Sequence, residues 1–203
     1  MNATVDLPLH VQTPDRWAAQ VLAHPLALLN DHAYLEKKAA SNALELLNRW
    51  PEPKAPRGWA TTLAGIARDE ASHLAAVCRL LHQRGGKLER VHKNPYANAL
   101  RSLVRKGQGR KEIVDRLLIS ALIEARSCER FEVLARALTD EGLAALYLGL
   151  FTSEMKHYRV FVRLAGDIFP KDQVNSRWQE MLAAEASILK EQPPGPRLHS
   201  GWE

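Results

Sequence analysis

Two Glu-x-x-His motifs stand in apolar stretches of this chain, Glu70 with His73 and Glu154 with His157. At the spacing of an α-helix the two residues of each motif share a face, and around Glu154 the rest of that face is aromatic and aliphatic. A buried carboxylate costs several kcal/mol unless a partner neutralises it. Each pair therefore either satisfies itself or binds something else, and carboxylates with imidazoles are ligands for divalent metal ions.

Two further glutamates interrupt apolar helical faces. Glu36 lies in a stripe of leucines and alanines between residues 29 and 47, and Glu124 lies in an apolar stripe between residues 117 and 131. A lone glutamate followed by a Glu-x-x-His motif thus occurs twice, offset by 88 residues at the first glutamate and by 84 at the second. This is the ligand set of di-iron and di-manganese four-helix bundles. The predicted metal ligands are Glu36, Glu70, His73, Glu124, Glu154 and His157.

The charge of this ligand set suits two divalent cations. Four carboxylates balance two such ions, two neutral imidazoles complete the coordination, and these donors favour Fe(II) or Mn(II). Without a metal the converging carboxylates would repel one another and raise one another's pKa. The alternative, in which separate Glu–His pairs serve only the fold, remains open.

Two other features of the sequence need an interpretation: an acid next to one motif, and a third copy of the motif. Asp69, beside Glu70, is a candidate to hold a ligand histidine by a hydrogen bond, although a surface acid fits equally well. A third Glu-x-x-His motif, from Glu89 to His92, follows a glycine pair and precedes a proline. We interpret this third copy as a coincidence.

The segments that carry the predicted ligands have helical periodicity, with prolines and glycines at their ends. Short turns join the first two helices and the next two, so the long segment between the pairs must cross the bundle. The predicted fold is all-α: a ferritin-like four-helix bundle with a long crossover connector and an additional C-terminal helix, forming a single ferritin-like domain with a dinuclear metal site over residues 1–203. The expected helices span about 25–49, 58–84, 112–138, 140–166 and 172–190. The core bundle covers about 25–166. Within it the connector covers about 85–111 and could contain a shorter helix. An extended tail covers about 191–203.

Composition limits the class of protein. With 203 residues, 46% hydrophobic and 25% charged, the chain suits one globular domain. No apolar run approaches the roughly 18–20 residues of a membrane span, and the N-terminus lacks the pattern of a secretion signal. Cys78 and Cys128 form no close pair, which favours reduced thiols. We expect a cytoplasmic protein without a membrane segment.

Positive charge is concentrated in one part of the chain. Residues 79–116 contain eleven lysines and arginines against three acids, a local charge of +8, whereas the whole chain carries +5 and the remainder therefore −3. Such a local field favours a polyanionic partner. A solvated, charged connector is the open alternative.

Four stretches that surround the predicted ligands resemble a known family. "DHAYLEKKAASNALELLNRW", "ARDEASHLAAV", "LIEARSCERFEVLA" and "SEMKHYRVFVRLA" are similar to the MiaE family of bacterial tRNA hydroxylases, over roughly residues 15–190 and at all six metal positions. The resemblance implies a non-haem di-iron monooxygenase with two iron ions, O2 as co-substrate and an external electron donor, which is a protein or reductase. It also implies hydroxylation of the isopentenyl group of 2-methylthio-isopentenyl-adenosine beside the anticodon.

With tRNA as the implied partner, the basic connector becomes the candidate site for the phosphates of the anticodon arm. The expected tRNA contacts are Arg84, Lys87, Arg90, Lys93, Arg101, Arg105, Lys106, Arg110 and Lys111. Three other functions remain open at this point: iron storage of the ferritin type, a manganese catalase, and a metal-free helical protein that binds RNA.

Overall fold

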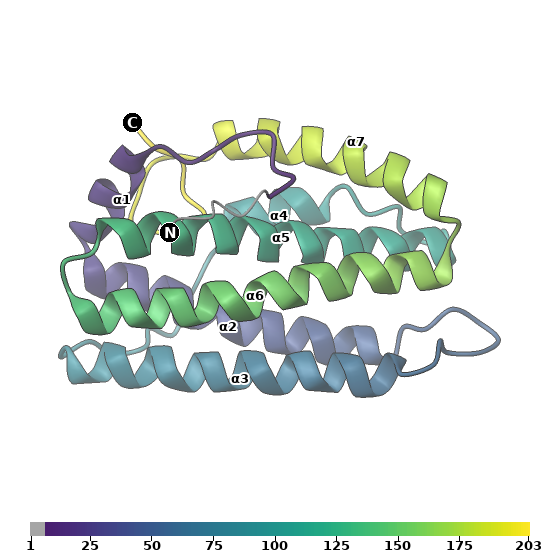
Figure 1. Cartoon of the computed structure of the whole chain (residues 1–203), viewed down its shortest axis with the longest axis horizontal. Helices are drawn as coiled ribbons and strands as arrows, with labels where there is room; N and C mark the ends of the chain where they lie inside the picture. The colour runs from purple at the N-terminus through teal and green to yellow at the C-terminus, as the bar shows by residue number, and fades with distance from the viewer. Residues whose placement is uncertain (1–6) are drawn as a thin grey trace.

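The computed structural model describes residues 7–203 and shows seven helices in that range (Figure 1). They match the five expected helices to within about two residues at each end, and add α1 and a short α4 inside the connector. Their bounds are α1 Asp15–Leu22, α2 Pro25–Leu47, α3 Trp59–Gln83, α4 Pro95–Arg101, α5 Arg110–Ala137, α6 Glu141–Ile168 and α7 Lys171–Lys190.

Four of these helices form the bundle. α2 packs against α3, and α5 packs against α6, each pair as an antiparallel hairpin (Figure 1). The segment between α3 and α5 runs from one end of the bundle to the other, so that α3 and α5 point in the same direction. This crossover confirms the predicted ferritin-like arrangement of an all-α fold. None of the helices in the described residues is long and apolar enough to cross a membrane.

Local chemistry sets several of the helix ends. The side chains of Asn94 and Asp140 accept hydrogen bonds from the backbone N–H groups of Ala97 and Leu143, which caps the first turns of α4 and α6. α3 ends before Gly85, which has a φ of +79° that disfavours other residue types. These signals fix where α4 and α6 begin and where α3 ends.

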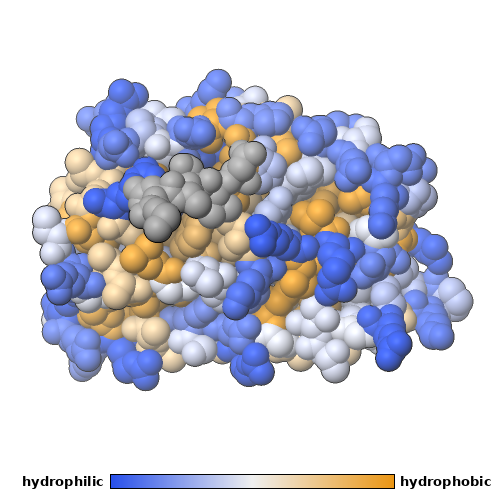
Figure 2. Space-filling view, in the orientation of Figure 1, coloured by the Kyte–Doolittle hydropathy of each residue, from blue (hydrophilic) through white to orange (hydrophobic). Residues whose placement is uncertain are grey.

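The core consists of two apolar clusters, one toward each end of the bundle. On α6, for example, Leu150 belongs to one cluster and Phe161 to the other, and Glu154 lies between them in the sequence. Each fully buried side chain of this size contributes about 1.5–3 kcal/mol. The clusters hold the bundle together from both sides of a polar middle layer. The outer surface is more polar than the core. Figure 2 shows hydrophilic residues over much of this face, with hydrophobic residues between them.

α7 lies along the outside of the bundle, against α5, α4 and α6. Glu185 of α7 is fully buried and joins three elements: it accepts hydrogen bonds of 2.8 Å from Tyr96 Oη on α4 and of 2.8 and 3.0 Å from Arg126 on α5. A buried charge pair of this kind specifies where α7 docks.

The tail after α7 has an irregular, extended path but is packed rather than free. Leu198 and Ser200 are fully buried, and the Leu198 N–H donates a hydrogen bond of 2.8 Å to Asp31 on α2. The guanidinium of Arg130 lies 4.0 Å from the ring centroid of Trp17 on α1 and 5.4 Å from that of Trp202 in the tail. The tail therefore returns across the bundle to α1, as Figure 1 shows.

Candidate metal centre

The bundle brings four of the six predicted ligands into one cluster. Glu36 of α2, Glu70 and His73 of α3, and Glu154 of α6 each offer a ligand atom, and these atoms all lie within 4.8 Å of one another. Nδ1 of His73 lies 3.0 Å from Glu154 Oε1 and 3.6 Å from a carboxylate oxygen of both Glu36 and Glu70. The three carboxylates now face only the imidazole of His73. A cation bound between these atoms would contact all four side chains.

The remaining two predicted ligands lie at the same centre. Nδ1 of His157 is 2.7 Å from Glu70 Oε1 and 2.9 Å from Glu154 Oε2. Glu124 of α5 lines a small cavity together with Glu36, Glu70 and Glu154. All six side chains therefore meet in the polar layer between the two apolar clusters.

Several atoms of this cluster are buried and lie close to one another without a well-aligned hydrogen bond, which tests whether the residues fit a metal. Both carboxylate oxygens of Glu70, Oε1 of Glu154 and Nδ1 of His73 are in this state. Unpartnered buried acceptors cost free energy, and carboxylates and imidazoles facing one another in an apolar core suit hard divalent cations. The donor set fits a pair of such ions.

The electrostatics of the cluster agree with that reading. Burial raises the pKa of Glu36, Glu70 and Glu124, and the Glu154 carboxylate raises that of Glu124 further. Burial alone would lower the pKa of the two histidines. The neighbouring carboxylates, above all that of Glu154, have the opposite and larger effect. They raise the pKa of His73 to about 12 and the pKa of His157 to about 10. In the metal-free chain, protons therefore occupy the place of positive metal charge.

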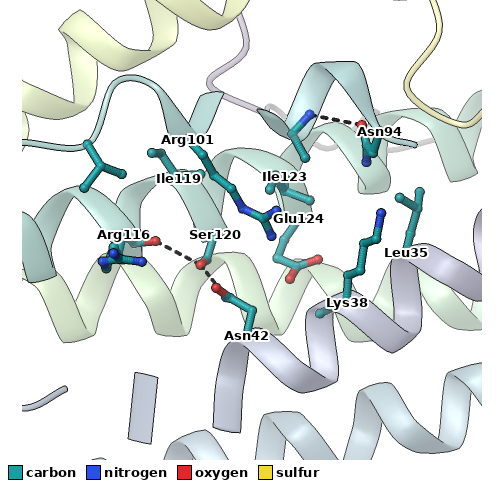
Figure 3. Close-up of a pocket in the computed structure, with 13 residues that line it drawn as sticks. Leu35, Lys38, Asn42, Asn94, Arg101, Arg116, Ile119, Ser120, Ile123 and Glu124 are labelled. Carbon is teal, nitrogen blue, oxygen red and sulfur yellow. Dashed lines mark hydrogen bonds between the residues drawn. The ribbon is translucent and has the colours of Figure 1, made fainter. Parts of the chain in front are cut away.

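A larger pocket leads from the surface to this centre. It opens to solvent and lies between α2, α4 and α5, so we call it the α2–α4–α5 pocket (Figure 3). It shares Leu35, Ala39, Ile123 and Glu124 with the smaller cavity at the metal ligands. Glu124 is therefore the point where a ligand entering from solvent would meet the metal centre.

The family model for tRNA-(MS[2]IO[6]A)-hydroxylase (MiaE) matches residues 2–200. The chain belongs to the MiaE family.

Similar proteins support the same assignment. The tRNA 2-(methylsulfanyl)-N(6)-isopentenyladenosine(37) hydroxylase of Pseudomonas putida is 37% identical over 197 residues, covering 97% of this chain and 94% of that protein. The enzyme of the same name from Salmonella typhimurium is 28% identical over 240 residues, covering 95% and 87%. A solved structure, Protein 43 with aldehyde deformylating oxygenase activity from Synechococcus, matches with a TM-score of 0.87 at 33% identity and covers 96% of each chain.

Two residues contact the six predicted ligands from outside their cluster. Asp69 was a candidate to hold a histidine, and its Oδ2 lies 3.6 Å from Nε2 of His157, the nitrogen that faces away from the carboxylates. His32 was not predicted: its Nε2 lies 2.6 Å from Glu36 Oε1, and its ring stacks 5.6 Å from that of Tyr147. The signal for His32 was present in the sequence, because a residue four positions before Glu36 shares its helical face.

The nine expected tRNA contacts divide by their surroundings. Eight are exposed, and Arg105 is partly buried. Arg105 binds Asp115 through its backbone and guanidinium, Arg84 pairs with Asp140, and Arg110 donates to the carbonyl of Glu52. The side chains without such a role in holding the fold are Lys87, Arg90, Lys93, Arg101, Lys106 and Lys111.

The third Glu-x-x-His motif lies away from the metal ligands and attaches the connector to α2. The backbone N–H of Glu89 donates to Asn30, and its carbonyl accepts from Tyr34. His92 Nε2 lies 2.7 Å from Asp31 Oδ1, and its Nδ1 lies 2.8 Å from Lys38 Nζ. No metal role was expected of this motif, but the network around His92 was not foreseen.

Proposed function

We propose that this protein is an O2-dependent non-haem di-iron monooxygenase that hydroxylates the isopentenyl group of 2-methylthio-isopentenyl-adenosine beside the anticodon of tRNA. The observation that carries the proposal is the convergence of four buried glutamates and two histidines at one centre, in a chain that the MiaE model matches over residues 2–200. The tRNA substrate places the reaction in the cytoplasm.

The residues that would hold two irons are the six predicted ligands. Each histidine would offer Nδ1, the atom that already faces the carboxylates. The four glutamates would neutralise the positive charge of the two ions. A carboxylate has two oxygens, so one glutamate could contact both ions. When bound, the iron pair supplies the activation of O2, with electrons from an external donor; one oxygen atom enters the substrate and the other leaves as water.

The chain's own residues orient this centre and keep water from it. His32 holds one oxygen of Glu36, so that the other oxygen turns toward the cluster. Asp69 lies behind His157 and favours the tautomer that keeps Nδ1 free for a ligand bond. The apolar clusters on both sides keep bulk water from the two ends of the polar layer.

The tRNA would bind over the basic connector. The exposed lysines and arginines there attract phosphates and give a salt-dependent affinity. A base stacked in the anticodon loop cannot reach buried carboxylates, so the modified adenosine must leave its stack to react. Arg84, Arg105 and Arg110 already bind protein groups and would serve chiefly by holding the connector in shape.

A second function is supported by one specific observation, the likeness to a solved protein with aldehyde deformylating oxygenase activity. The α2–α4–α5 pocket has apolar walls that an aliphatic aldehyde would also fit. Three cationic side chains line the same pocket, Lys38, Arg101 and Arg116, and they favour a phosphorylated ligand over a neutral aldehyde.

The test is nucleoside mass spectrometry of tRNA that carries the isopentenyl modification. The tRNA is incubated with iron-loaded protein, a chemical reductant and O2, beside a Glu154→Ala variant and a parallel incubation with a long-chain aldehyde. We expect a nucleoside heavier by one oxygen atom with the wild-type protein and none with the variant. Loss of the aldehyde with unchanged tRNA would contradict the proposal and favour the second function.

A further inference from the structure

The α2–α4–α5 pocket is lined by three kinds of side chain. Arg101 is an exposed cation and Lys38 a half-buried one, Leu35, Ala39 and Ile123 are half-buried apolar side chains, and Glu124, which also lines the cavity at the metal ligands, is buried. Figure 3 shows Lys38 and Arg101 reaching into the pocket from α2 and α4, with Glu124 between them in this view. A ligand that matches this lining is anionic at its exposed end and apolar toward Glu124.

One of these cations is held in place by a chain of hydrogen bonds. A lysine ammonium can only donate, so Nδ1 of His92 must accept the 2.8 Å bond from Lys38. The proton of the neutral ring then lies on Nε2, which donates the 2.7 Å bond to Asp31. The ring is further fixed by stacking on Tyr34, with centroids 4.8 Å apart and planes 6° from parallel. The position of Lys38 is therefore set by a side chain from the connector.

The arrangement brings like charges together at a partly desolvated site. Both side chains line the same pocket, burial lowers the pKa of Lys38 and the Arg101 charge lowers it further, and Lys38 has a neutral ring rather than a carboxylate as its bonding partner. Arg116, the third cation of the pocket, is by contrast neutralised by Glu112 at 2.9 Å. Two cations held near each other are stabilised when an anion binds between them.

We propose that the α2–α4–α5 pocket receives the modified nucleotide of tRNA, that Lys38 and Arg101 bind a phosphate beside that nucleotide, and that Asp31 and His92 position Lys38 for this contact. The inference rests on the proposed function, because the family supplies the isopentenyl-adenosine that the pocket would take. The isopentenyl group then lies along the apolar walls toward Glu124, and the phosphate stays at the rim. Lys38, Asp31 and His92 thereby join the set of residues that select an RNA substrate.

The test measures binding separately from turnover. The ligand is a synthetic anticodon stem-loop that contains N6-isopentenyl-adenosine, and its Kd for metal-loaded protein without reductant is measured by fluorescence anisotropy at several salt concentrations. We expect Lys38→Met to raise the Kd about tenfold and to lower the salt slope by about one phosphate contact. Lys37→Met is the matched control: Lys37 is an exposed neighbour on the same helix, and its loss should change the Kd by less than about twofold.

The positioning role has its own pair of variants. His92→Leu removes both hydrogen bonds and should weaken binding in the same direction as Lys38→Met. His92→Gln keeps an acceptor for Lys38 and a donor for Asp31, so it should restore most of the affinity and of the salt slope. A thermal melt of each variant shows whether the connector stays folded, and His92→Gln preserves the test if His92→Leu does not.

The outcomes separate this inference from the proposed function. If Lys38→Met binds the stem-loop with the affinity and salt slope of the wild-type protein, the inference is overturned. This holds even if the wild-type protein hydroxylates the same stem-loop when reductant and O2 are added. A weakened Lys38→Met in a protein that binds the RNA but never hydroxylates it would support the phosphate site and overturn the hydroxylase. Equal losses in His92→Leu and His92→Gln, with both variants folded, would refute the positioning role of His92.

Discussion

Removal of the metal should make the protein lose stability as the pH rises above about 6.5. His73 and His157 have pKa values raised to about 12 and about 10 in the folded metal-free chain, against 6.5 when unfolded. Below 6.5 both states are protonated and the full stabilisation is present. Above it the unfolded chain releases these protons first, so stability falls until the pH passes the folded pKa. The buried carboxyls with raised pKa act in the same direction above their unfolded value of 4.5.

The size of the effect follows from the number of bound protons: in this pH range the folded chain holds one more proton per histidine than the unfolded chain. Each pH unit in this window changes the free energy of unfolding by about 1.36 kcal/mol per histidine. For His157 alone, whose side chain is 5% exposed, two pH units above 6.5 remove roughly 3 kcal/mol. This is a large part of a typical total of about 5–15 kcal/mol. His32 and His199, whose pKa burial lowers, are neutral in the folded chain and lose their protons near pH 6.5 in the unfolded chain, so they oppose the slope only at the lower end of this window.

The assay is urea denaturation of chelator-treated protein at pH about 6.5 and about 8.5, with and without added Mn(II). Metal should reverse the trend, because ligation requires neutral imidazoles and releases protons, so that binding tightens as the pH rises. His157→Gln should lose a large part of the metal-free slope, whereas His82→Gln, at an exposed position near the end of α3, should keep it. Metal-free protein that is equally or more stable at the higher pH would refute the protonated cluster on which this reasoning depends.

Three further predictions concern other parts of the molecule. Arg126→Met leaves Glu185 buried with only the Tyr96 hydroxyl and no cationic partner, and should lower the free energy of unfolding by about 3–5 kcal/mol in urea; a loss below about 1 kcal/mol would show that the pair does not hold α7. Replacement of Lys106 and Lys111 by alanine should lower the salt slope of tRNA binding by roughly 1.5, and an unchanged slope would remove these residues from the tRNA interface. His32→Leu should weaken metal binding about 10–100-fold in competition with a chelator, while His32→Gln, which keeps a donor beside Glu36, should lose less; equal affinities would assign His32 to packing alone.

The bundle and the layer in which the four glutamates and two histidines meet could be predicted because both depend on local periodicity. A carboxylate in an apolar helical stripe is visible without knowledge of the partner helix, and four such stripes define one layer of a bundle. Glu36 and Glu124 illustrate this, since neither belongs to a recognisable motif alone, yet each lies where the repeat requires it. Helix ends were predictable where a proline or glycine marks them, as at Gly85.

Contacts between distant segments were not predictable. α1 has eight residues and no side-chain cap, so its stability comes from packing of Trp17 against Arg130 and not from a local signal. The bond between His92 and Lys38 joins residues 54 positions apart, and the charge count of the connector could not distinguish Arg105, which binds Asp115, from the exposed Lys106. Such partners depend on tertiary geometry, which single-residue patterns do not encode.

The central claim is that the six residues at the polar layer hold two irons that insert an oxygen atom from O2 into the isopentenyl group of tRNA. The most direct measurement is nucleoside mass spectrometry after turnover of isopentenyl-modified tRNA under isotope-labelled O2, with protein shown to carry two irons per chain. We expect one labelled oxygen atom in the product nucleoside. A product that takes its oxygen from water, or no heavier nucleoside from fully iron-loaded protein, would contradict the claim.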